Sequence, residues 1–346
     1  MRLKKYIMKN NNINVAIVGA SGYTGLELVK ILINHPHFNL TYLANTTGNT
    51  TINKLHPCLN GVCELEVFKA SASDIAKTCG LAFLALPHKH SMGFAKELLK
   101  LGVKVVDLSA DYRLELNTYE KHYCPHIDKD NLPNAVYGMP EFYKDEIKKA
   151  SLIANPGCYP TASLLAIMPF VPYIDENSSI FIDAKSGLSG AGKKLSDTST
   201  FVNISENMFA YNPLKHRHTP EIIEKVKLVG NKDLKINFVP HLIPLTRGML
   251  TSVYCSVNKS INALEVLKEF YKDQTHIRIL DKPATIKDTS GTNFCDIFVA
   301  QDGNDLFINT SIDNLLRGAS SQAVVNANIM YGFEDDLGIN KLAFVP

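Results

Sequence analysis

The chain has 346 residues, 45% of them apolar, and its 36 basic residues nearly balance 34 acidic ones. This length and apolar content suffice for two compact domains with separate cores. The charge balance gives no reason to expect a nucleic acid partner, and no apolar run approaches the 18 residues of a membrane span. We interpret residues 1–12 as a frayed extension and not a signal peptide, because the apolar stretch after them is short and ends in a glycine-rich turn.

The first half of the chain alternates apolar strands with amphipathic helices. Strands are predicted at 13–18, 39–44, 62–68, 80–87, 103–109 and 152–154, and helices at 24–34 and 91–102. This alternation indicates βαβ units and a doubly wound parallel sheet of the Rossmann type. The polar segment 45–53 is predicted to be a loop.

After about residue 155 the pattern changes to long strands with few helices between them. These strands are predicted at 179–187, 236–243, 249–257, 294–301 and 305–312. Such a grouping indicates a mostly antiparallel sheet in an α+β arrangement, covered on one face by helices such as 160–170 and 262–272. A last helix is predicted at 317–331.

We therefore expect an α/β chain with two domains. Residues 1–157, completed by the C-terminal segment 317–346, are predicted to bind a dinucleotide. Residues 158–316 are predicted to form a domain for catalysis, substrate binding and oligomerisation.

The first predicted strand ends in a GxxGxxG turn that opens a helix. Glycines let the backbone approach a pyrophosphate, and the free N–H groups of the helix N-terminus favour an anion. The predicted cofactor-binding residues of this turn are Gly19, Ser21, Gly22, Tyr23, Thr24 and Gly25. NAD enzymes usually carry an acidic residue at the end of the second strand. This chain has Ala44-Asn45-Thr46-Thr47 there, which leaves room for a 2′-phosphate and favours NADP, although the usual arginine is absent too.

Cys158 lies in the most informative segment, SLIANPGCYPTASLLAIMPF. A strand turns through Asn155-Pro156-Gly157 into Cys158, and Pro160 suits the first turn of a helix. A thiol at a helix N-terminus is expected to have a lowered pKa and to act as a nucleophile. Backbone N–H groups of the turn are candidates for stabilising an oxyanion.

The other cysteines, at positions 58, 63, 79, 124, 255 and 295, are interpreted as ordinary packing residues. An odd, scattered set without a CxxC pair indicates reduced thiols and a cytoplasmic protein. We expect neither disulfides nor a metal site.

Beyond these residues the chain resembles the N-acetyl-gamma-glutamyl-phosphate reductase family of arginine biosynthesis. The matching segments, in the family's order, are GASGYTGLEL (19–28), LSADYRL (108–114), NPGCYPTA (155–162), KSGLSGAGK (185–193), HRHTPEI (216–222), FVPHLIPLTRG (238–248) and DNLLRGASSQAVVNANIMYGF (313–333). The resemblance departs at 45–53, where the family tends to have Ser/Arg-rich residues.

The resemblance implies a semialdehyde dehydrogenase-like fold and an NADP-dependent oxidoreductase. The implied reaction is reduction of N-acetyl-L-glutamyl 5-phosphate to the 5-semialdehyde with release of phosphate. It places Cys158 at the family's nucleophile, as carrier of a thioester, and implies a homo-oligomer, either a dimer or a tetramer.

A thiolate mechanism needs an acid/base group, and His216 and His218 offer two imidazoles in one short segment. If this segment is extended, both side chains point to the same side. By resemblance we favour His216, with His218 as the alternative.

The substrate's phosphate and carboxylate need fixed cations, and arginine is scarce: six arginines stand against thirty lysines. Arg113 is the candidate for the substrate phosphate, and Arg217 is a second substrate-binding candidate. Tyr211 and Glu221, beside and within the HRHTPEI segment, complete the predicted substrate-binding set.

Two further segments are predicted to approach the cofactor. The glycine-rich stretch 187–192 brings Ser189 and Gly190 into consideration, although a flexible loop explains this composition equally well. Asn314, just before the last helix, resembles a residue that touches the nicotinamide carboxamide.

Two alternatives remain open from the sequence. One is the same chemistry on an aminoadipate-type acyl phosphate held by a carrier protein, which a strongly basic surface near the site would favour. The other is a protein that senses NADP without catalysis.

Overall fold

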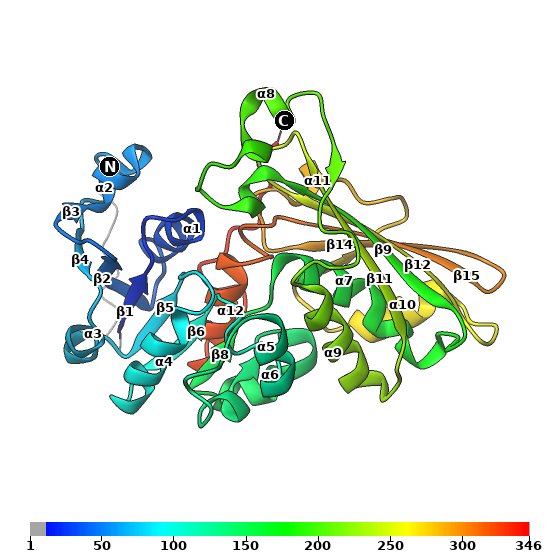
Figure 1. Ribbon diagram of the computed structural model, residues 1–346, viewed down its shortest axis with the longest axis horizontal. Coiled ribbons are helices and arrows are strands. Elements are labelled where there is room, and N and C mark those ends of the chain that lie inside the picture. The colour runs from blue at the N-terminus through cyan, green and yellow to red at the C-terminus, as the bar shows by residue number, and fades with distance from the viewer. Residues whose placement is uncertain (1–11, 346) are drawn as a thin grey trace, which may run out of the picture.

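The computed structural model describes residues 12–345. Eleven residues of the predicted N-terminal extension, 1–11, lie outside that range. Two sheets organise the chain: a parallel one on the left of Figure 1 and a larger, strongly twisted one on the right, with helix α12 (Ser320–Met330) between them.

The first sheet has the strand order β3-β4-β2-β1-β5-β6-β8-β7 within the described residues. Its strands are β1 (Ile13–Val18), β2 (Phe38–Asn45), β3 (Thr50–Thr51), β4 (Glu66–Lys69), β5 (Leu81–Leu84), β6 (Lys104–Asp107), β7 (Val136–Tyr137) and β8 (Leu152–Ala154). All neighbouring pairs are parallel except β3 with β4. The order reverses between β1 and β5, which is the switch point of a doubly wound sheet.

Helices cover both faces of this sheet. One face carries α1 (Tyr23–Leu32), α6 (Pro140–Lys149) and α12, and the other carries α3 (Ala72–Thr78) and α4 (Ser91–Lys100). The chain thus returns to the first sheet with its last long helix. The predicted Rossmann-type fold is confirmed.

The second sheet has the strand order β10-β11-β9-β12-β15-β14-β13 among the described residues. Its strands are β9 (Ser179–Gly187), β10 (Phe209–Ala210), β11 (Lys235–Ile243), β12 (Met249–Ser256), β13 (Ile277–Ile279), β14 (Cys295–Asp302) and β15 (Asp305–Ile312). Only β9 with β11 and β13 with β14 pair in parallel. Helices α7 (Cys158–Ile167), α9 (Thr219–Gly230) and α10 (Ala263–Tyr271) share one apolar core with this sheet. The predicted, mostly antiparallel second sheet is therefore confirmed.

The structure differs from the sequence-based expectation in the short elements. The segment predicted as a loop, 45–53, contains β3 and the start of α2 (Ile52–Leu55), because Ile52 is fully buried and anchors the chain against the first sheet. Helix α5 (Leu116–His122), α6 and α9 were not predicted; neither were the short helices α8 (Phe201–Ile204) and α11 (Ile286–Thr289). Of all the helices between residues 12 and 345, none has the length and apolar character needed to cross a bilayer.

Candidate active site

A cavity of about 260 Å³ lies where the first sheet faces the second. Its lining includes residues just beyond four strands of the first sheet: Gly22–Thr24 after β1, Ala85, Leu86 and His88 after β5, Leu108 and Arg113 after β6, and Pro156–Cys158 after β8. Parallel sheets bind ligands outside the carboxyl ends of their strands, at the switch point. The cavity is therefore at the position where this fold binds ligands.

The glycine turn at the switch point is built for close backbone approach. Gly19 has a φ of +98°, and a side chain there would place Cβ 2.2 Å from the carbonyl oxygen of Ala85. A Cβ on Gly25 would lie 2.4 Å from the Gly19 oxygen. The N-cap of α1, Gly22, offers no side-chain cap, so the first N–H groups of the helix remain available for an anion. The turn fits a dinucleotide pyrophosphate.

Some of the predicted cofactor residues line the cavity and others do not. Gly22, Tyr23 and Thr24 line the cavity, as do Ser189, Gly190 and Asn314 from the second half of the chain. Gly19, Ser21 and Gly25 do not line it.

The strand–turn–helix elbow around Cys158 has the predicted form. Helix α7 begins at Cys158 itself, with Gly157 as N-cap. The carboxylate of Glu221 accepts hydrogen bonds from the Gly157 N–H (3.1 Å) and the Tyr137 hydroxyl (2.8 Å), and it pairs with Arg113 (3.3 Å). Both charged side chains are almost fully buried. The elbow is thus fixed by a buried ion pair.

Cys158 is partly exposed in the cavity, at the first residue of a ten-residue helix. The expected lowering of its pKa is wrong. Burial raises the pKa of the Cys158 thiol, and the backbone N–H of Tyr159, together with Arg113 and Arg217, offsets that effect only in part. The desolvation of the thiolate outweighs the helix N-terminus here.

His218, not His216, lines the cavity with Cys158. A Cβ on Gly157 would lie 2.7 Å from the His218 Nε2, so the absence of a side chain lets the imidazole reach the elbow. His218 Nδ1 is buried and has no hydrogen-bond partner among the described residues. Burial, followed by nearby positive groups, holds the pKa of His218 well below its ordinary value, so the ring is neutral at pH 7.

His216 is packed among aromatic rings and does not line the cavity. Its ring lies between those of Tyr159, Tyr211 and Phe238, with centroids 5.3–5.5 Å apart. Its Nδ1 accepts the backbone N–H of His218 at 3.1 Å. The two histidines are neighbours, as predicted, but they lie in a turn before α9 and not in an extended segment.

The two candidate arginines differ in what they can still bind. Arg113 is buried and donates to Asn155 O (2.7 Å) and Leu108 O (2.7 Å), in addition to its ion pair with Glu221. These contacts use three of its N–H groups. The side chain also lines the cavity, so its role toward the substrate phosphate stays a prediction. Arg217 is exposed, lines the cavity and forms no ion pair with any residue from 12 to 345. It is therefore a cation available for an anionic ligand, and Lys193 also lines the cavity.

Two predicted substrate residues do not line the cavity. Glu221 lies behind the elbow, as described above. Tyr211 donates from its hydroxyl to the Tyr159 hydroxyl at 3.0 Å. Sequence reasoning also missed Gly318, where a Cβ would lie 2.6 Å from the Cys158 Cβ. The run Gly318-Ala319-Ser320 was the signal, since small residues allow close approach.

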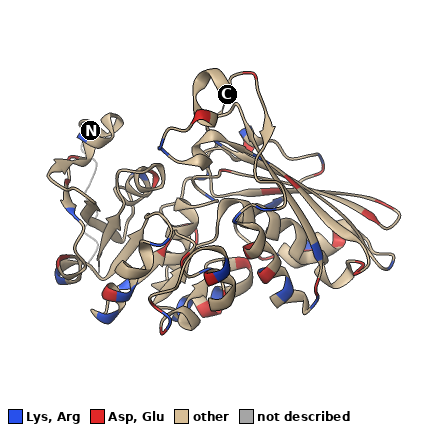
Figure 2. Cartoon of the chain, in the orientation of Figure 1, with Lys and Arg blue, Asp and Glu red and all other residues tan. Residues whose placement is uncertain are grey.

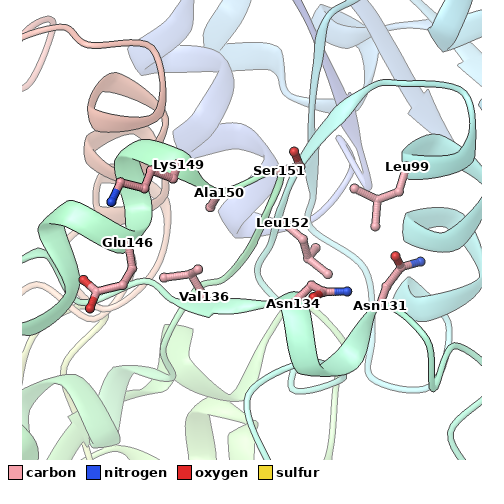
Figure 3. Close-up of a pocket in the computed structure, with 9 residues that line it drawn as sticks. All are labelled: Leu99, Asn131, Asn134, Val136, Glu146, Lys149, Ala150, Ser151 and Leu152. Carbon is pink, nitrogen blue, oxygen red and sulfur yellow. The ribbon is translucent and has the colours of Figure 1, made fainter.

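A second cavity, of about 450 Å³, contains none of the predicted site residues (Figure 3). It is lined by Leu99, Val136 and Leu152 together with polar residues of the segments around 131–134 and 146–151. Leu152 begins β8, so this cavity lies at the amino end of the strand whose carboxyl end leads to Cys158. It is unrelated to the ligand-binding edge of the sheet.

Family models match both halves of the chain. The semialdehyde dehydrogenase NAD binding domain matches residues 14–150, and the semialdehyde dehydrogenase dimerisation domain matches residues 158–314. The junction between these matches falls at the elbow.

Full-length relatives share one name. The N-acetyl-gamma-glutamyl-phosphate reductase of a Sulfurovum species is 60% identical over 96% of this chain and 100% of its own length. That of Wolinella succinogenes is 56% identical over 96% of this chain and 99% of its own length.

Solved structures with the same fold are aspartate semialdehyde dehydrogenases. The Vibrio cholerae enzyme II superimposes with a TM-score of 0.71 at 17% identity, covering 93% of this chain and 99% of that one. The Candida albicans enzyme with NADP gives a TM-score of 0.70 at 14% identity and the same coverage. At these identities the likeness concerns the fold.

Proposed function

The chain belongs to the N-acetyl-gamma-glutamyl-phosphate reductase family, and from this premise we propose that it reduces N-acetyl-L-glutamyl 5-phosphate to the 5-semialdehyde in arginine biosynthesis. The observation that carries the proposal is the cavity itself. It gathers Cys158 at a helix N-terminus, His218, a free Arg217 and the glycine turn.

Cys158 is the proposed nucleophile. Its sulfur attacks the acyl carbon, the carbon–oxygen bond to phosphate breaks, and a thioester forms on Cys158 as phosphate leaves. The N–H groups at the start of α7 stabilise the oxyanion of this step. After reduction the thiohemiacetal collapses, the carbon–sulfur bond breaks, and the aldehyde leaves with the thiolate regenerated.

His218 is the proposed acid/base. Burial lowers its pKa, so at pH 7 the ring is neutral and has one unprotonated nitrogen, which is the proposed acceptor of the Cys158 thiol proton at the start. The same proton is available to the oxygen of the reduced intermediate. His216 supports this role by accepting the His218 backbone N–H.

NADP(H) is the proposed cofactor and supplies the hydride when bound. The first turn of α1 would hold its pyrophosphate, and Ser189, Gly190 and Asn314 would line the opposite side of the dinucleotide. The absence of a carboxylate at the end of β2, where Asn45 stands, supports NADP over NAD. We assign cofactor binding to residues 1–157 with 317–346, and catalysis to residues 158–316.

The arginine with a free guanidinium, Arg217, is the proposed partner of the substrate's anionic groups. Arg113 and Glu221 act as support for the elbow. The aminoadipate-type carrier alternative receives no support, because basic and acidic residues are mixed over the outer helices in Figure 2 and the relatives above carry the glutamyl name.

A homo-oligomer is supported by the outward face of the second sheet. Phe181, Tyr254 and Phe307 lie opposite one another on β9, β12 and β15, and the first two side chains are 54% and 48% exposed. An aromatic row of this kind is expected to be covered by another subunit. The seven free cysteines support a reducing, cytoplasmic setting.

The direct test is NADP reduction with N-acetyl-glutamate semialdehyde and phosphate, run beside the aminoadipate analogue. We expect strong preference for the glutamate compound, and no activity in Cys158→Ser with dinucleotide binding near normal. Full activity in that variant would exclude the thioester route, and preference for the analogue would change the substrate.

A further inference from the structure

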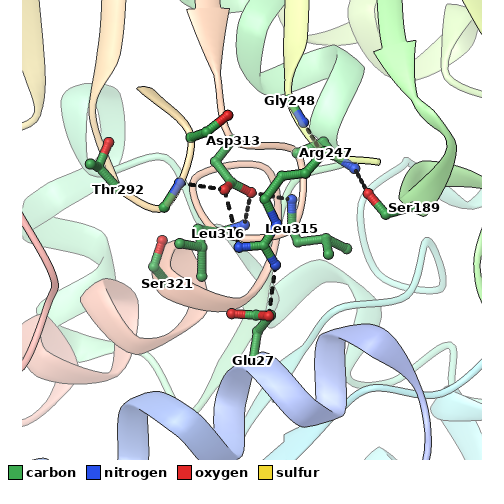
Figure 4. A network of polar contacts seen from close by, with 12 residues as sticks. Glu27, Ser189, Arg247, Gly248, Thr292, Asp313, Leu315, Leu316 and Ser321 are labelled. Carbon is green, nitrogen blue, oxygen red and sulfur yellow. Dashed lines mark hydrogen bonds and ion pairs between the residues drawn. The ribbon is translucent and has the colours of Figure 1, made fainter. Parts of the chain in front are cut away.

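The loop between β11 and β12 connects the cofactor helix to the wall of the cavity. Its Arg247 pairs with Glu27 of α1 (Nη2 to Oε1, 2.6 Å) and with Asp313 at the end of β15 (Nη1 to Oδ2, 3.3 Å). Figure 4 shows the guanidinium between these two carboxylates. The Arg247 side chain thus connects α1, which packs on the first sheet, with the end of β15 in the second sheet.

The same loop holds the two residues that face α1 across the cavity. The Gly248 N–H donates to Asn314 Oδ1 at 2.7 Å, and Asn314 Nδ2 donates to Ser189 Oγ at 2.9 Å. The Ser189 N–H in turn donates to Thr246 O at 3.0 Å. Residues 246–248 therefore fix Ser189 and Asn314 in a closed set of hydrogen bonds.

The carboxylates that Arg247 joins are poorly solvated. The Glu27 and Asp313 side chains are 7% and 0% exposed, and that of Arg247 is 16% exposed. Asp313 also accepts backbone N–H groups from Gly291, Leu315 and Leu316. Charges in such surroundings are weakly screened. Glu27 also pairs with Lys30 (3.0 Å), so removal of Arg247 leaves Glu27 with one partly exposed lysine and takes from Asp313 its cation.

The ion pair of Arg247 with Glu27 lies close to the glycine turn at the start of α1. Glu27 lies one helical turn after Tyr23 on α1, and Tyr23 lines the 260 Å³ cavity together with Ser189. A neighbouring cavity of about 370 Å³ is lined by Glu27, Arg247 and the same Tyr23 and Ser189. The Arg247 guanidinium therefore lies beside the space between α1 and Ser189.

We propose that Arg247 is a positioning residue for the dinucleotide, which sets the spacing between the N-terminal turn of α1 and the Ser189–Asn314 wall. The proposal rests on the proposed function, since it takes the ligand to be NADP(H). Only the planar guanidinium of arginine offers separate N–H groups to both carboxylates at once, so lysine is not an adequate replacement.

The test is a double-mutant cycle read out as the Kd for NADPH, measured by nicotinamide fluorescence on the full chain. Arg247→Lys and Glu27→Gln are each expected to raise this Kd about tenfold. The Kd of the double variant is expected to be no higher than the higher of the two single-variant values, because both changes break the same Arg247–Glu27 ion pair. Thermal unfolding without ligand shows whether each variant is folded.

The matched control is Arg278→Lys, which disturbs an ion pair with Asp296 on the far strands β13 and β14. It is expected to leave the Kd for NADPH unchanged. Kd values within twofold of wild type in folded Arg247→Lys or Glu27→Gln, or effects that multiply in the double variant, would overturn the proposal. If Arg247→Lys does not fold, Glu27→Gln alone decides it. A wild-type chain that does not bind NADPH would instead count against the proposed function.

Discussion

The acid/base assignment can be decided at the level of single residues. His218→Asn is expected to lower kcat by 100-fold or more, the usual contribution of a general acid/base. His216→Asn, which removes a packing ring and the acceptor of one N–H, is expected to cost much less in kcat. Steady-state kinetics of both variants at pH 7 check this, and the reverse ranking would return the role to His216.

Arg217 gives a second prediction at this scale. Arg217→Gln is expected to raise KM for the acyl phosphate by about tenfold to 100-fold, because hydrogen bonds to charged groups contribute about 1.5–3 kcal/mol. Binding of NADPH should change little. Initial rates over a range of acyl phosphate concentrations measure the effect, with Arg278→Gln as the control. A KM equal to that of wild type would remove Arg217 from the substrate site.

Residue roles were only partly readable from the sequence. Cys158 was identifiable because a strand, a proline–glycine turn and a helix start surround it. Which of His216 and His218 lines the cavity was not readable, because it depends on which ring the turn before α9 buries between aromatic side chains. The buried ion pair of Arg113 was not readable for a similar reason: its partner, Glu221, is 108 residues away in sequence.

At the scale of elements, the elbow between β8 and α7 depends on the buried pair of Glu221 and Arg113. Glu221→Ala leaves that arginine uncompensated and removes the acceptor of the Gly157 N–H. We expect a loss of about 3–5 kcal/mol in the free energy of unfolding. Urea denaturation measures it.

The control for this prediction is Glu265→Ala on α10, which removes an exposed pair with Lys268. Such surface pairs contribute about 0–1 kcal/mol. Equal losses in the two variants would contradict the claim that the pair behind the elbow is structural.

The long strands were predictable, whereas several helices, among them α6 and α9, and the two-residue strands were not. The strands of the second sheet follow a clear period-two pattern, and β9 and β15 have the predicted bounds. Helix α9 carried a usable signal in Ile222 and Val226, both buried and four residues apart, but its polar remainder obscured it. The two-residue strand β3 exists only because β4 lies beside it.

For the whole molecule, buried histidines determine how stability depends on pH. Burial lowers the pKa of His88 to about 3 and those of His216 and His276 to about 4, and it holds that of His218 well below its ordinary value. Below pH 6.5 the unfolded chain therefore binds more protons than the folded one, and stability falls as the pH falls. Asp107 opposes this trend, since burial raises its pKa to about 6.

Burial also raises the pKa values of Asp296 and Asp313. The six histidines with lowered pKa values, at positions 35, 56, 88, 216, 218 and 276, outnumber these three carboxyl groups. We expect the free energy of unfolding to decrease between pH 7 and pH 5, with each unbalanced proton contributing up to about 1.4 kcal/mol per pH unit. Urea denaturation at three pH values across this range tests the sign. A free energy of unfolding that rises toward pH 5 would contradict the burial of these rings.

The central claim is that one sulfur, at the start of α7, carries the acyl group. The most direct measurement is to mix the chain with N-acetyl-glutamate semialdehyde and NADP without phosphate, quench in acid, and map the peptides by mass spectrometry. The account predicts an acyl group on the peptide that contains Cys158 and none in Cys158→Ser. Acylation of a different cysteine, or a turnover-competent enzyme whose Cys158 stays unmodified, would contradict it.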